Sequence, residues 1–403
     1  MNHESYFAEK PLKGYRVIDF TTNISGPSAT TILSDLGAEV IKIEKIINGD
    51  DSRSMEPSFN DKSAYFVTIN RGKNSIAINL KENDGYRVII DLIKNSDIII
   101  ENFRRDTVEK LKLDYATIKK IKINIIYGSL SSYGNTGPYY NKPGYDAIVQ
   151  ANSGIMSVNG NKGSDPARVS VSLLDAGAGM WLAMGIIIAV LKKERTGKGS
   201  YISTSLMETA LYWMNYYISS FQVTQLIPER IGSEHPSFAP YGAYKTSNGF
   251  IMIGISNNNL FSNLCHALGL EELMHDKRFE NNKLRVDHKN ELNRIINKGL
   301  MNNTKEYWYN KLSECNVPCS IIKNVKEALE DEQVRALNLF QNVNEYDKNI
   351  KIQSIPIKFE DKYLKIEKNS PSLGEDTYKL MRVLGYDDEK ISYLLKKGVI
   401  KNF

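Results

Sequence analysis

Short apolar segments alternate with helix-like segments through the first third of the chain, and this alternation limits the folds open to it. The apolar segments are rich in Ile and Val, as buried strands are. The predicted strands are 16–20, 38–44, 75–80, 97–103 and 123–130, and the predicted helices are 28–36, 83–94 and 107–120. Strands separated by helices are typical of a parallel sheet covered on both faces. The sequence therefore predicts an α/β domain.

The pattern changes at about residue 228. Residues 243–253 are predicted to form a hairpin, because Asn248-Gly249 is a strong turn signal between two apolar runs. Helical segments are predicted near 259–268, 284–300 and 304–314, followed by a strand at 317–322. We therefore predict that residues 228–325 form a smaller inserted domain that contains both helices and strands.

Composition excludes several classes of protein. The 403 residues are 41% hydrophobic and 25% charged, and the net charge of +5 comes from scattered Lys and Arg. This argues against a nucleic-acid-binding protein, which needs a concentrated basic face. No apolar segment lies near Met1, so neither a signal peptide nor a membrane anchor is expected. Three cysteines without a C-x-x-C pair predict reduced thiols and a cytoplasmic location. The spacing of His and Cys predicts no metal site.

One carboxylate, Asp175, stands before an uncharged run from Ala176 to Leu191. The length and composition of the run predict a core helix, and sixteen residues are too few to span a bilayer comfortably. A plain interpretation makes Asp175 the N-cap of this helix. A functional interpretation is that the small residues from Ala176 to Gly179 leave room for a ligand to approach the carboxylate. The two interpretations are compatible.

The distribution of histidine narrows the possible nucleophiles. A Ser or Cys nucleophile needs a nearby base, and no His occurs between residues 4 and 234. An ordinary Asp, with a pKa near ~3.9, is already ionised at neutral pH and can act as a covalent nucleophile. Asp175 is therefore the preferred candidate, with Asp19 and Asp146 as rivals.

Cations follow several of the predicted strands. Lys45, Lys81 and Arg104 stand at strand ends, with Arg105 and Lys110 close behind. Each alone is typical of a solvated surface charge. Because the carboxyl ends of parallel strands meet at one edge, together they can bind a polyanion such as a nucleotide-bearing thiol. Neither the G-x-G-x-x-G nor the G-x-x-x-x-G-K-[ST] pattern is present in a position to support a dinucleotide or P-loop site.

Several motifs together resemble the class III CoA-transferases, also called the CaiB/BaiF family. They lie at 11–20, Gly26-Pro27, 35–44, 101–104, 134–139, 143–146, 196–199, 317–319 and 384–386. The resemblance covers nearly the whole chain. It implies a large Rossmann-like domain with a parallel sheet, built from both ends of the chain, and a smaller inserted α+β domain.

The resemblance also implies boundaries and an assembly. Residues 1–205 would form the first part of the large domain and 206–227 a linker. The inserted domain would occupy 228–325, and 326–403 would be a second linker and the C-terminal part of the large domain. Two chains would form an interlocked homodimer, with acyl-CoA and a small organic acid as substrates.

The family's catalytic aspartate corresponds to Asp175. It would form a mixed anhydride and then an aspartyl-CoA thioester at a water-poor helix start. Backbone N–H groups after Asp175 would stabilise the developing oxyanion. The residues matched to the family's CoA site are Thr22, Asn23, Lys45, Ile78, Leu80, Lys81, Asn102, Phe103, Arg104, Lys110 and Tyr145.

Departures from the family pattern bear on the substrate. Ile24 stands where formyl-CoA transferases have Gln, and their glycine run is not visible in 228–245. Both departures count against formyl-CoA and oxalate. The acyl group stays open among carnitine-like betaines, 2-hydroxy acids and other organic acids.

Two alternative functions remain. The α-methylacyl-CoA racemases share the fold but need a His at the position of Tyr145, and a Tyr with a pKa near ~10 is a poor base for that step. The other alternative is a CoA-binding protein without activity, against which the intact Asp175 argues.

Overall fold

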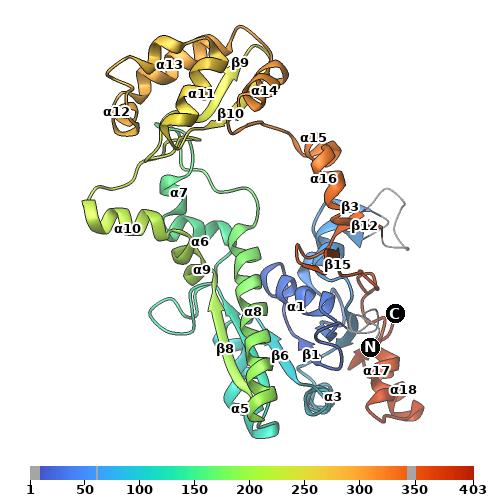
Figure 1. Cartoon of the computed structure of the whole chain (residues 1–403). Coiled ribbons are helices and arrows are strands. Elements are labelled where there is room, and N and C mark those ends of the chain that lie inside the picture. The colour runs from blue at the N-terminus through green and yellow to red at the C-terminus, as the bar shows by residue number, and fades with distance from the viewer. Residues whose placement is uncertain (1–9, 60–61, 343–350) are drawn as a thin grey trace. The chain divides into compact units, whose positions relative to one another are not determined.

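The computed structural model describes residues 10–59, 62–342 and 351–403. These residues form two compact units (Figure 1). The described residues of the first unit lie within Met1–Ser153, Val169–Ile218 and Asn338–Phe403, and the second unit consists of Gly154–Arg168 and Ser219–Leu337. The first unit is therefore built from N-terminal, middle and C-terminal segments of the chain.

A seven-stranded sheet forms the centre of the first unit, in the order β16-β5-β2-β1-β6-β7-β8. Its strands are β1 (Arg16–Asp19), β2 (Glu39–Glu44), β5 (Asn74–Ile78), β6 (Ile98–Glu101), β7 (Ile126–Ser131), β8 (Ser200–Ser205) and β16 (Ile400–Lys401). All neighbours run parallel except β16, which pairs antiparallel with β5. The predicted α/β class with a mainly parallel sheet is confirmed.

Helices of the first unit pack on this sheet or on one another, and those at residues 83–94, 105–110, 115–121, 377–383 and 388–396 place apolar side chains against its Ile- and Val-rich strands. They are α1 (Ser25–Asp35), α2 (Ala64–Ile69), α3 (Asn83–Lys94), α4 (Arg105–Lys110), α5 (Tyr115–Ile121), α6 (Asp146–Asn152), α8 (Leu173–Thr196), α9 (Leu206–Trp213), α17 (Thr377–Val383) and α18 (Asp388–Lys396). Short hairpins add β3 (Ser58–Phe59) with β4 (Lys62–Ser63), β12 (Phe340–Asn342) with β13 (Lys351–Gln353), and β14 (Lys358–Phe359) with β15 (Lys362–Tyr363).

The single helix predicted at 107–120 is wrong. The chain forms two shorter helices there, α4 and α5, because Lys112 adopts a left-handed conformation with φ of 54°. Asp114 then caps α5 by accepting a hydrogen bond from the N–H of Thr117 at 3.0 Å.

Helix α8 is longer than the predicted uncharged run. It has 24 residues and, among those the structure describes, it is the one helix long and apolar enough to cross a membrane. The length argument against a membrane span is therefore wrong. Packing supports the core-helix interpretation instead, because α8 lies against α1 and β8 (Figure 1), contacts β7 as well, and buries half of its most apolar stretch.

The second unit contains both helices and strands, as predicted. A hairpin of β9 (Tyr241–Thr246) and β10 (Gly249–Gly254) turns at Ser247-Asn248, and β11 (Cys319–Ile321) pairs with β10. The helices are α7 (Ile155–Val158), α11 (Asn258–Leu268), α12 (Asn282–Asp287), α13 (Lys289–Leu300), α14 (Lys305–Glu314), α15 (Val325–Glu330) and α16 (Glu332–Leu337). Helix α10 (Asn215–Thr224) continues from the first unit into the second.

The boundaries of the second unit differ from the expected 228–325. The unit begins at Ser219, ends at Leu337 and also includes residues 154–168. Two hydrogen bonds attach that early segment: the N–H of Gly232 donates to the carbonyl of Gly160 at 2.8 Å, and the Arg230 guanidinium donates to the carbonyl of Ser164 at 2.7 Å.

Helices α1 and α8 approach closely at Gly179. A Cβ atom at Gly179 would lie 2.7 Å from the carbonyl oxygen of Ser25 and 3.3 Å from the backbone nitrogen of Ala29. Both are backbone atoms of α1, which cannot move without shifting the helix. The contact therefore requires glycine at this position of α8.

We predict that Gly179→Ala lowers the free energy of unfolding by about 1–3 kcal/mol, because the added methyl group forces the helices apart. Chemical denaturation measures the change. Gly185→Ala in the same helix is the matched control, since its Cβ meets only a side-chain methyl group of Ile202, at 2.7 Å. Equal stability of the two variants would contradict the prediction.

Candidate active site

The first part of the site is the turn after β1, which is tied to the end of β6. The N–H of Thr22 donates to the side-chain oxygen of Asn102 at 3.0 Å, and the Asn102 amide group donates back to the carbonyl of Thr22 at 2.9 Å. Asn23 follows in a left-handed conformation, with φ of 66°. Three residues of the predicted CoA site therefore lie together at the carboxyl edge of the sheet.

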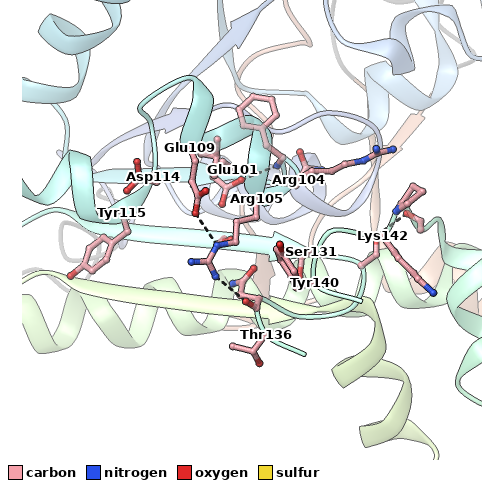
Figure 2. Close-up of a pocket in the computed structure, with 18 of the residues that line it drawn as sticks. Glu101, Arg104, Arg105, Glu109, Asp114, Tyr115, Ser131, Thr136, Tyr140 and Lys142 are labelled. Carbon is pink, nitrogen blue, oxygen red and sulfur yellow. Dashed lines mark hydrogen bonds and ion pairs between the residues drawn. The ribbon is translucent and has the colours of Figure 1, made fainter. Parts of the chain in front are cut away.

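A cavity of about 630 Å³ opens at the same edge (Figure 2). Five of the predicted residues line it, namely Asn23, Asn102, Phe103, Arg104 and Tyr145. Arg105 also lines it but is already engaged, because it donates to Glu109 at 2.9 Å and to the carbonyl of Asn135 at 3.1 Å. The cavity therefore presents cationic and amide groups at its wall.

The interior of the cavity includes residues that sequence reasoning missed. Tyr115, Tyr127 and Tyr201 pack with ring centroids 5.1 to 5.9 Å apart. Beside them, Glu101 is only 3% exposed. Burial raises the pKa of Glu101 to about 7, although hydrogen bonds from Ser129 and from the N–H of Phe103 oppose this. In the sequence, the Glu101-Asn-Phe-Arg104 motif is the feature that could have identified the Glu101 carboxyl group as part of the site.

The other predicted CoA residues do not line the cavity. Lys45 is exposed and pairs with Asp51 at 3.0 Å. Ile78 is buried in the core and its backbone pairs with Ile400, so its side chain is not available to a ligand. Thr22 bonds to Asn102, as described above. The remaining three are Leu80, packed against the core, and the cations Lys81 and Lys110 near the ends of β5 and α4.

Asp175 lies in the first turn of α8, which begins at Leu173. The interpretation of Asp175 as the N-cap is wrong, because Asp146 caps the helix from outside. One oxygen of Asp146 accepts hydrogen bonds from the N–H of Leu174 at 2.7 Å and from that of Asp175 at 3.1 Å. The carboxylate of Asp175 is therefore not used for capping.

The expected oxyanion donors after Asp175 are not free. The helix starts earlier than predicted, so the N–H of Ala176 already donates to the carbonyl of Ser172 at 3.0 Å. This N–H group belongs to the helical ladder and is not available to an oxyanion in this arrangement.

Burial is the main influence on Asp175 and raises its pKa to about 6. The negative charge of Asp146 adds to this rise, whereas a hydrogen bond with the side chain of Ser25 opposes it. The pKa expected for Asp175, that of an ordinary Asp, was therefore too low, but the ionised form of its carboxyl group still predominates at pH 7. The rival Asp19 is fully buried and paired with Lys73 at 3.1 Å, and its pKa is lowered to about 2. Asp19 therefore has a structural role.

Neither a metal cluster nor a disulfide marks the site. Within residues 10–59, 62–342 and 351–403, no group of three or more His, Cys, Asp or Glu side chains is placed to hold a metal ion. The cysteines Cys265, Cys315 and Cys319 are free thiols. The cytoplasmic location stays a prediction.

The fold and the site together define an α/β protein that presents cations at a sheet edge and a half-buried carboxylate at a helix start. Comparison with known proteins makes this specific: residues 12–377 match the profile of CoA-transferase family III. The chain belongs to this family, and the predicted family resemblance is confirmed. It is thus a transferase of the CoA-transferase class, whose members use acyl-CoA as a substrate.

Relatives support the assignment over nearly the full length. The chain is 35% identical to succinyl-CoA:glutarate CoA-transferase of Mus musculus, covering 97% of this chain and 91% of that protein. It is 37% identical to acetyl-CoA:oxalate CoA-transferase of Acetobacter aceti, covering 82% and 85%. A solved CaiB/BaiF family protein from Brucella suis superposes with a TM-score of 0.84 at 30% identity, covering 93% and 100%.

We predict that two substitutions move the pKa of Asp175 in opposite directions. Asp146→Asn lowers it toward ~3.9, because the charge disappears while the amide oxygen can still cap α8. Ser25→Ala raises it, because the ionised form loses a hydrogen bond. Titration of carbon-13-labelled aspartate by NMR measures both changes. Shifts of the same sign in the two variants would contradict this account of the site.

Proposed function

We propose that this protein transfers CoA from an acyl-CoA donor to a free carboxylic acid, with Asp175 as the covalent carrier. The observation that carries the proposal is the state of the Asp175 carboxylate. It is half-buried, is not used to cap α8, and has no Lys or Arg of the described residues among the groups that shift its pKa. A carboxylate that is not neutralised by a cation keeps its nucleophilicity.

The proposed reaction has two covalent intermediates. A carboxylate oxygen of Asp175 attacks the thioester carbon of the donor, the C–S bond breaks, and CoA leaves as the thiolate. The thiolate then attacks the aspartyl carbonyl of the mixed anhydride, which releases the donor acid and leaves an aspartyl-CoA thioester. The acceptor carboxylate repeats these steps in reverse and leaves as the new acyl-CoA. Protons are not consumed, so a neighbouring His is not required.

Free cations at the sheet edge support the proposed CoA site. The side chains of Lys81, Arg104 and Lys110 form no ion pair with any residue that the structure describes. Phosphate groups of CoA are suitable partners for them, because cations bind phosphates with charge-assisted hydrogen bonds. We keep Thr22, Asn23, Asn102, Phe103 and Tyr145 as further proposed contacts.

The named activities of relatives suggest the first substrates to test. The Mus musculus relative is named for succinyl-CoA and glutarate, and the Acetobacter aceti relative for oxalate. We therefore propose a short dicarboxylic acid as acceptor and succinyl-CoA as donor. Ile24 and the missing glycine run in 228–245 argue against oxalate as the acceptor. Transfer from succinyl-CoA to a panel of acceptors that includes glutarate, oxalate and a 2-hydroxy acid decides which acid the protein uses.

The racemase alternative has less support. Tyr145 occupies the position where a racemase needs His, and its side chain is 72% exposed. Phenol groups in general have a pKa near ~10, which makes tyrosine a poor base for removing an α-proton near neutral pH. Deuterium incorporation at the α-carbon of a 2-methylacyl-CoA, without CoA exchange, would support the racemase. If neither reaction occurs, the binding-only interpretation remains.

We predict that Asp175→Ala lowers the rate of transfer by at least about a thousandfold, because the covalent carrier is lost, while CoA binding measured by calorimetry persists. In the wild type, incubation with succinyl-CoA and hydroxylamine should leave a hydroxamate on the peptide containing Asp175, detected by mass spectrometry. Asp287→Ala, at an exposed aspartate in α12, is the control and should keep full activity. Full transfer by Asp175→Ala would refute the proposal.

We also propose that two copies of the chain form the interlocked homodimer implied by the family resemblance. An apolar stripe on α8 supports this: Met180, Met184, Ile188 and Leu191 are between 46 and 60% exposed. Their spacing places them along one side of the helix. A continuous exposed apolar stripe is typical of a surface that another protein covers.

The prediction for this stripe is that Met180→Glu/Ile188→Glu abolishes the dimer, because charged side chains would be buried without partners. Light scattering coupled to gel filtration measures the mass. Ile123→Glu is the control, since Ile123 is an exposed apolar residue outside the stripe, and it should leave the dimer intact. A monomeric wild type, or a dimeric double variant, would refute the proposed assembly.

A further inference from the structure

A fully buried ion pair lies beneath the turn that follows β1. Lys42 is in the middle of β2, and its ammonium group lies 2.7 Å from a carboxylate oxygen of Asp50, with both side chains 0% exposed. Removing two charges from water costs several kcal/mol per ion, so such a pair is a poor source of stability compared with apolar side chains. Its placement therefore calls for an explanation other than stability.

Both members of the pair hold the backbone of the turn. The Lys42 ammonium group donates to the carbonyl of Thr21 at 2.8 Å. The other oxygen of Asp50 accepts from the N–H of Asn23 at 3.1 Å. Asn23 is left-handed, a conformation that a residue other than glycine adopts at some cost. The two hydrogen bonds offset that cost and fix Asn23 in place.

Further bonds leave the turn little freedom. Asp19 accepts from the N–H of Thr21 at 2.9 Å and from its hydroxyl group at 2.6 Å. On the far side, Thr22 is held by Asn102, as described above. Every residue from Thr21 to Asn23 is therefore bonded through its backbone to a side chain elsewhere in the unit.

The same turn leads directly to the carboxylate of Asp175. Helix α1 begins at Ser25, two residues after Asn23, and the Ser25 side chain lies close enough to Asp175 to favour the ionised form of its carboxyl group. The close contact at Gly179 holds this end of α1 against α8. A movement of the turn would therefore change the position of Ser25 relative to Asp175.

We propose that the buried Lys42–Asp50 ion pair is a positioning element that sets the Thr21–Ser25 turn and thereby aligns the CoA-contacting residues with Asp175. Lys42 and Asp50 touch no substrate themselves. They act through the backbone of Thr21 and Asn23, and then through Ser25. The part concerning CoA rests on the proposed function, whereas the part concerning Ser25 and Asp175 does not.

The chain offers a matched control. Arg71 and Asp35 form a second buried pair in the same unit, 2.6 Å apart, with side chains 6 and 7% exposed. Neither is hydrogen-bonded to a residue of the Thr21–Ser25 turn in any interaction the structure describes. Removing this pair therefore imposes a comparable change on the core without releasing the turn.

The experiment compares Lys42→Met/Asp50→Asn with Arg71→Met/Asp35→Asn. Both double variants remove a whole pair, so that no buried charge is left alone. In Asp50→Asn the side-chain oxygen can still accept the hydrogen bond from the N–H of Asn23. A change in CoA affinity or in the pKa of Asp175 therefore reports the loss of the hydrogen bond from Lys42 to the carbonyl of Thr21. Thermal unfolding of both variants shows whether they are equally well folded.

Two readouts decide the proposal. In the free protein, the pKa of Asp175, measured by NMR, should rise in Lys42→Met/Asp50→Asn, as in Ser25→Ala, and stay unchanged in the control. The Kd for CoA should rise roughly tenfold or more in the first variant only. Equal results for the two double variants would overturn the positioning role. A wild type that neither binds CoA nor transfers it would instead refute the proposed function, and the NMR readout would still decide the role of the pair.

Discussion

The contact between α1 and α8 is the constraint on which the candidate active site depends. Helix α8 carries Asp175, and α1 begins with Ser25 immediately after the turn that contains Thr22 and Asn23. Because Gly179 has no side chain, the two backbones approach closely enough for Ser25 to reach the carboxylate. A loosely packed pair of helices would separate the Asp175 carboxylate from the turn, even with every side chain retained.

Charge is distributed around this contact in a consistent way. Lys42 and Lys73 are buried and paired with Asp50 and Asp19, whereas Lys81, Arg104 and Lys110 form no ion pair with any described residue. No cation is among the groups that shift the pKa of Asp175. Its carboxylate is thus more basic than an ordinary one, because burial and Asp146 disfavour the charge. A more basic carboxylate is a better nucleophile provided that it is still ionised at the working pH.

Much of the fold was predictable because apolar strands and their helices are local patterns. The runs 16–20 and 38–44 became β1 and β2, and the signal at Asn248-Gly249 became a hairpin. What failed depends on contacts between distant segments. The start of α8 was missed because its cap, Asp146, comes from another helix, and the tyrosine cluster joins residues from three separate segments. The raised pKa of Asp175 was missed for the same reason, since burial cannot be read from neighbouring residues.

The antiparallel strand β16 covers one edge of the sheet by pairing Ile400 with Ile78, from a segment far along the chain from β5. During synthesis, therefore, this edge of β5 has no partner in its own chain until residues 79–399 have been made. An open strand edge is a template for pairing with other chains. The order of synthesis makes this edge a point of vulnerability to aggregation in newly made protein, and a variant that lacks β16 would keep the edge exposed.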